Sequence, residues 1–166
     1  MTTIPVLVML GVRLCVALLT EAQVALDDED WSYVLDRLLE FKSHIERYMR
    51  AESEVLYPKL SALMPESDGA LMQLRQEHAE IAALIQQALC GANDRDKARC
   101  AHAIGELIEL ISSHWMSEQS SLYALAEQTE SQDHVLRELA EKLGQALDAS
   151  DEESAASGRV ARRRLH

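Results

Sequence analysis

Residues 41–60 read FKSHIERYMRAESEVLYPKL and place His and Glu at helical spacing along an apolar-periodic segment. Two later segments repeat the pattern: residues 74–81 read LRQEHAEI, and residues 111–126 read ISSHWMSEQSSLYALA. In the last of them His114 and Glu118 lie four residues apart, so on a helix both project from one face. Imidazole and carboxylate side chains from several facing helices are the usual construction of a di-iron or di-manganese site in a helical bundle. The three segments therefore predict a helical bundle with a metal site inside it.

Glu52 and His78 complete this candidate site from the two preceding segments. If the chain reverses around Glu66 and again near Arg95, the candidate side chains fall within about one to two helical turns of one level, at a rise of about 1.5 Å per residue. The first apolar segment meets that level with residues 5–13, PVLVMLGVR, which offer no ligand. The candidate metal ligands are therefore Glu52, His78, His114 and Glu118.

The size and composition of the chain predict one domain. It has 166 residues, of which 48% are hydrophobic and 4% aromatic, enough for a single core. A formal net charge of −12 argues against nucleic acid as a partner, because phosphate binding needs a basic surface. The apolar stretch 4–19 is interrupted by Arg13 and is too short to span a bilayer, so no membrane partner is expected. Three cysteines without a CxxC pair are typical of thiols in a reducing compartment, so we expect a cytoplasmic protein.

The apolar period stays near 3.6 residues along the chain, which predicts an all-α fold. Helices are expected over residues 5–26, 31 to 60 or 63, 67 or 68 to 89, 93 or 94 to 126, and 131–147. Pro58 bends or ends the second helix, and Gly91 follows the end of the third. Short connections make neighbouring helices antiparallel, so we predict an up-down-up-down four-helix bundle with a short C-terminal fifth helix over residues 4–148. Residues 149–166 have the composition of a disordered tail.

Over about residues 5–128 the chain resembles the hemerythrin-like, or HHE cation-binding, family, most specifically in AESEVLYPKL, LRQEHAEI and SSHWMSEQSSLYALA. The resemblance implies a di-iron site with a His from the first helix, a His and a Glu four apart from the second, a His from the third, and a His and a Glu four apart from the fourth. Four of these positions are matched, by Glu52, His78, His114 and Glu118. Tyr48 stands at the second-helix His position, and the first-helix position falls near Gly11 or Val12. The resemblance thus implies one complete half of the site, with two His and two carboxylates, beside an incomplete half.

Three states of the site agree with these residues. In the first, a single iron, manganese or zinc ion binds the four matching residues, since nitrogen and carboxylate ligands suit all three metals. In the second, another metal ion is retained with Tyr48 phenolate as a replacement ligand and His44 assisting, because His44, Tyr48 and Glu52 are spaced four residues apart on one helical face. In the third, the site has been lost and the bundle serves protein contacts.

The first helix is apolar almost all round, whereas an ordinary bundle helix has a polar stripe. Something must cover its outer face. We expect an isologous homodimer through this helix, with Val8, Leu14 and Leu18 in the contact.

Two functions from different classes remain. The resemblance implies a non-haem metal protein, with one or two iron ions, that senses or handles oxygen, nitric oxide, peroxide or iron. The alternative is a metal-free regulatory bundle that binds a protein partner, as regulators that hold a sigma factor do, and an acidic surface suits a basic partner. No acid–base pair, nucleophile constellation or phosphate loop in the sequence points to another class of enzyme.

Overall fold

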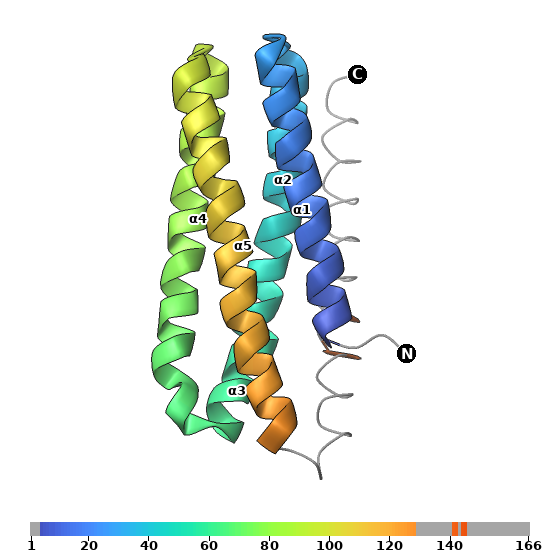
Figure 1. Ribbon diagram of the computed structural model, residues 1–166, viewed down its shortest axis with the longest axis vertical. Helices are drawn as coiled ribbons and strands as arrows, with labels where there is room; N and C mark the ends of the chain where they lie inside the picture. The colour runs from blue at the N-terminus through green and yellow to red at the C-terminus, as the bar shows by residue number, and fades with distance from the viewer. Residues whose placement is uncertain (1–3, 129–140, 143, 146–166) are drawn as a thin grey trace, which may run out of the picture.

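The computed structural model describes residues 4–128, 141–142 and 144–145. Within these residues the chain is all-α, with four long helices joined by short connections (Figure 1). In chain order the elements are α1 (Ile4–Asp27), α2 (Trp31–Ala51), the π-helix η1 (Glu52–Leu56), α3 (Tyr57–Leu63), the 3-10 helix η2 (Pro65–Ser67), α4 (Asp68–Asp94) and α5 (Lys97–Gln128). The predicted all-α four-helix bundle is confirmed.

Consecutive long helices run in opposite directions, and each packs against two others (Figure 1). Helix α1 contacts α2 and α5, while α4 contacts α5 and α2. Of the fifth helix expected over residues 131–147, only residues 141–142 and 144–145 are described, and they are helical. The remainder of that helix and the expected tail over residues 149–166 lie outside the described residues.

The helix that begins at Trp31 does not continue regularly to residue 60. Its α-helical hydrogen bonding ends at Ala51, and in the following π turn the Tyr57 N–H donates to the Glu52 carbonyl. Pro58 has no N–H to donate, so it interrupts α-helical pairing directly after this turn. A π turn accommodates one extra residue. Glu52 and Tyr57 therefore lie on the same side of the chain. In a regular α-helix, by contrast, two residues five positions apart would point in different directions.

Helix α4 ends later than the sequence suggested. Gly91 lies inside it, and the helix ends only at Asp94, before Arg95 in the left-handed region at φ 55°. Gly91 is buried, and a Cβ on it would lie 2.8 Å from the backbone nitrogen of Cys100. This glycine lets α4 and α5 approach closely, so its interpretation as a helix terminator is wrong. Helix α5 accordingly begins at Lys97.

Two clusters of buried apolar side chains fill the bundle, and the candidate ligands lie between them. Along α2 and η1, Ile45 belongs to the larger cluster, Leu56 belongs to the smaller one, and Glu52 falls between them. Along the antiparallel α4 the order is reversed, with the smaller cluster before His78 and the larger cluster after it. A polar layer thus interrupts the apolar core, and buried polar groups in such a layer require partners.

The outer face of α1 is less apolar than expected. Leu18 is only 3% exposed, so its assignment to an outward contact is wrong. Leu14 and Val24 do face outward, with exposed fractions of 41% and 62%. The side chain of Val8 is outside the described part of α1. None of the described helices combines the length and apolarity needed to cross a membrane.

Candidate metal site

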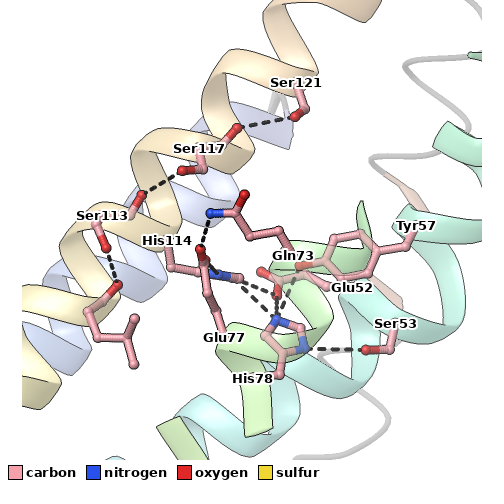
Figure 2. A network of polar contacts seen from close by, with 11 residues as sticks. Glu52, Ser53, Tyr57, Gln73, Glu77, His78, Ser113, His114, Ser117 and Ser121 are labelled. Atoms are coloured by element: carbon pink, nitrogen blue, oxygen red, sulfur yellow. Dashed lines mark hydrogen bonds and ion pairs between the residues drawn. The ribbon is translucent and has the colours of Figure 1, made fainter. Parts of the chain in front are cut away.

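Three side chains from different elements bring donor atoms together: Glu52 at the start of η1, His78 on α4 and His114 on α5 (Figure 2). One donor atom of each lies within 4.8 Å of the other two. Nε2 of His78 is 3.1 Å from Oε2 of Glu52 and 3.3 Å from Nε2 of His114. Two nitrogens bound to one metal at about 2.0–2.1 Å lie about 3 Å apart. The two imidazoles are therefore spaced as ligands of a shared ion.

His114 is oriented by a residue that the sequence reasoning missed. Its Nδ1 lies 2.7 Å from Oε2 of Glu77, whose other oxygen accepts a hydrogen bond of 3.0 Å from the Gln73 amide. Because a carboxylate only accepts, the single N–H of a neutral His114 is held on Nδ1, and the lone pair of Nε2 is left facing Glu52 and His78. A carboxylate behind a ligating imidazole is the usual way in which proteins orient such a ligand.

Nε2 of His78 has more polar neighbours than it can satisfy. Besides Glu52 and His114, it faces the Tyr57 hydroxyl at 3.1 Å (Figure 2). An imidazole nitrogen carries either one hydrogen or one lone pair, so it can satisfy only one of these three atoms. Several buried donor atoms that cannot all hydrogen-bond to one another are typical of a site that binds a cation. Tyr57 was not among the predicted site residues.

The charges around the cluster also favour a cation. Burial alone would raise the pKa of Glu52, but hydrogen bonds and charge from His114 and His78 hold it below its ordinary value. Burial alone would lower the pKa of His114, but hydrogen bonds and charge from Glu52 and Glu77 hold it above its ordinary value. Glu52 is therefore an anion at neutral pH, and a positive charge beside it is stabilised.

Glu118, the fourth predicted ligand, is buried beside this cluster without a partner. It is 1% exposed, and neither carboxyl oxygen has a hydrogen-bond partner among the described residues. Burial and the charge of Glu52 raise the pKa of Glu118 well above its ordinary value. Its oxygens do not join the three-donor group, but Glu118 and Glu52 line one small cavity. An unpartnered buried carboxyl costs free energy that a bound cation would offset, so the residues present fit a metal ion.

The cavity between these carboxyls and α1 has a volume of about 20 Å³, room for roughly one water molecule. Tyr48 lines it, and the Tyr48 ring occupies the space beside Gly11, where a Cβ would lie 2.0 Å from Cζ of the ring. Tyr48, which stands at one expected ligand position, thus fills the space left by Gly11, and the other expected position falls near Gly11 or Val12. Burial, together with Cys15 and Glu52, raises the pKa of Tyr48, so this phenol is neutral at neutral pH.

Helix α1 also contributes Cys15 to the cavity, a donor that the sequence reasoning did not expect in this layer. Burial, and secondarily the charge of Glu52, raise the pKa of this thiol to about 12. The structure does not bring His44 to the site: Nδ1 of His44 contacts the Arg47 guanidinium, and burial and that charge lower the pKa of His44.

Comparison with known protein families matches residues 12–126 to the hemerythrin HHE cation binding domain. The matched range contains every residue of the donor group, along with Glu118 and Tyr48. Comparison with curated proteins and with solved structures gave no match.

Proposed function

Because the chain belongs to the hemerythrin HHE cation-binding domain family, we propose that it binds one transition-metal ion per chain through Glu52, His78, His114 and Glu118. The observation that carries the proposal is the convergence of three donors from three elements around Nε2 of His78. The unpartnered carboxyl of Glu118 beside them adds support, since a cation would offset its burial.

One ion rather than two is supported by the packing of α1 against α2. A second ion in the family pattern needs a ligand from each of these helices, but the Tyr48 ring fills the space beside Gly11. The remaining donors, two imidazoles and two carboxylates, suit iron, manganese or zinc.

We propose iron as the resident ion and a small ligand such as oxygen, nitric oxide or peroxide as its partner. Bound iron would supply an open coordination position for that ligand. The protein's own contribution is a small cavity lined by Val12, Trp115 and other apolar side chains, which excludes bulk water and limits the size of what enters. Binding or sensing is proposed rather than turnover of an organic substrate, because about 20 Å³ holds nothing larger than a very small molecule.

The test is the metal content of protein purified without chelator or affinity-metal resin. We expect close to one transition-metal ion per chain, measured by elemental analysis, and we expect His114→Ala to lose it because a donor and its orienting contact are removed together. The matched control is His102→Ala, an exposed histidine on the same helix, which should keep the metal. Wild-type occupancy in folded His114→Ala would refute the assignment.

Occupancy should also depend on pH. Ligating imidazoles must be deprotonated, so metal is lost as pH falls below about 6. Because Glu52 and Glu77 raise the pKa of His114, the loss should begin at a higher pH than for an ordinary imidazole.

A second candidate is a metal-independent regulatory bundle. It is favoured by the net charge of −12 and by the outward-facing Leu14 and Val24 on α1, which together suit a basic, partly apolar protein partner. Metal-free wild-type protein in the elemental analysis would favour this candidate over the first.

A further inference from the structure

Tyr57 is a fully buried phenol whose ring contacts two other side chains. Its ring stacks on that of His78, with centroids 5.5 Å apart and planes 26° apart, and the Arg75 guanidinium lies 5.7 Å from its centroid. Such contacts fix the ring orientation. The hydroxyl faces the donor group, 3.1 Å from Nε2 of His78.

The π turn is what places this hydroxyl at the site. Tyr57 follows Glu52 by five residues, and the hydrogen bond from the Tyr57 N–H to the Glu52 carbonyl closes the wide turn between them. In an α-helix the residue four positions later would share the face of Glu52, and that residue is the buried, apolar Leu56. Widening the turn by one residue brings a phenol beside the carboxylate, and π turns are frequent at functional sites.

The distance from Nε2 of His78 to Tyr57 is similar to its distances to the proposed ligands. Nε2 of His78 is 3.1 Å from the Tyr57 oxygen, 3.1 Å from Oε2 of Glu52 and 3.3 Å from Nε2 of His114. Neighbouring ligands of a metal with bonds of about 2.0–2.1 Å are separated by about 3 Å. The phenol oxygen thus lies as close to Nε2 of His78 as the Glu52 carboxylate does.

We propose that Tyr57 is itself a metal ligand, bound through its phenol oxygen beside Glu52, His78 and His114. This inference rests on the proposed function, since it requires a metal, and it identifies that metal as ferric iron, which a hard anionic oxygen suits. On coordination the O–H bond of the phenol is replaced by an iron–oxygen bond, and the proton passes to solvent. No change in the oxidation state of the iron is involved.

The experiment uses full-length protein loaded with ferric iron supplied as its nitrilotriacetate complex. A phenolate on ferric iron absorbs in the visible by charge transfer, whereas imidazole and carboxylate ligands do not. We expect coloured wild-type protein whose resonance Raman spectrum contains phenolate ring modes. Tyr57→Phe should lose the band and those modes while retaining iron at saturating supply, because the other donors remain. Tyr33→Phe, an exposed tyrosine on α2, is the matched control and should keep both.

Iron content and colour are measured on the same samples, so that failure of metal binding can be distinguished from failure of the proposed role of Tyr57. Wild-type protein that holds iron without the band overturns the role of Tyr57 and leaves metal binding standing. Wild-type protein that takes up no iron overturns the proposed function, and the role of Tyr57 with it. A band that survives Tyr57→Phe, or disappears in Tyr48→Phe instead, also overturns the proposal. A Tyr57→Phe chain that is folded by circular dichroism but free of iron supports it, because only one hydroxyl has been removed.

Discussion

Two carboxyl groups, Glu52 and Glu118, are buried at the centre of the bundle, and their pKa values are shifted in opposite directions. The histidines lower the pKa of Glu52, while burial and the charge of Glu52 raise the pKa of Glu118. Protonation of Glu118 is therefore favoured in the metal-free protein, because that proton removes the repulsion between two neighbouring carboxylates. A metal ion would replace that proton, so binding should release protons and should depend on pH.

Glu118→Gln is expected to stabilise the metal-free protein at neutral pH. Below a carboxyl pKa of about 4.3 both the folded and unfolded states are protonated, and Glu118 carries no penalty. As pH rises from there toward the raised pKa of the folded state, only the unfolded state ionises, so wild-type stability falls relative to the variant. The gain in free energy of unfolding should be on the order of 1 kcal/mol at neutral pH, measured by urea denaturation.

At saturating metal the order of stability should reverse, because the wild type binds the ion more tightly and gains more from it. Glu109→Gln, an exposed carboxyl on the same helix, should change neither measurement. A metal-free Glu118→Gln protein less stable than wild type at neutral pH would contradict the electrostatic account of Glu118.

At the scale of elements, α1 and α2 meet through a glycine and an aromatic ring. A Cβ on Gly11 would lie within 2.0 to 2.4 Å of three atoms of the Tyr48 ring. The resemblance places Tyr48 at one family ligand position and another near Gly11 or Val12, and the larger Tyr48 ring needs the smaller Gly11 opposite it. We therefore expect the effects of substitutions at Gly11 and Tyr48 on stability to be coupled.

Gly11→Ala should destabilise the wild type by about 1–3 kcal/mol, as overpacking of a close contact does. In a Tyr48→Ala background the same change should be neutral or stabilising, because the ring is gone and alanine favours a helix over glycine by about 0.5–1 kcal/mol. The double-mutant cycle is measured by urea denaturation. Gly105→Ala on α5, where nothing lies within 4 Å of the added Cβ, is the control and should stabilise in either background. Equal effects of Gly11→Ala in both backgrounds would exclude the coupling.

At the scale of the whole molecule, the outward side of α1 exposes apolar side chains to solvent. Leu14 is 41% exposed there, and Val24 is 62% exposed. Apolar area left in water is unfavourable by roughly 25 cal/mol per Å², so we propose that a second copy covers this face, as in an isologous homodimer.

Leu14→Glu should convert that dimer to a monomer, because a charge would be buried in the contact. Sedimentation at micromolar concentration measures the change. Met72→Glu on α4, which is diagonal to α1 in the bundle, should leave the dimer intact. A wild-type chain that sediments as a monomer would contradict the dimer and would leave α1 as a candidate surface for a different protein.

The amino-acid sequence was enough to predict the helical class and the bundle, and it supplied four candidate metal ligands. Apolar periodicity and i, i+4 spacing are local properties of the chain, and they survive folding because a helix has one fixed geometry. Helix ends were less well predicted: Gly91 resembled a terminator, but its closeness to the Cys100 backbone is a contact between two helices that no local pattern contains.

The side chains that surround the proposed ligands could be identified only from the packed helices. Glu77 precedes His78 in the sequence but reaches across to His114 on α5, and that contact depends on the rotation of one helix against another. Tyr57 enters the site because a π turn shifts its register by one residue, and α-helical periodicity would have placed Leu56 there instead. The fit of Tyr48 against Gly11 depends on how closely α1 approaches α2. Distances and rotations between elements arise from packing of the whole core, so residue spacing within one helix cannot predict them.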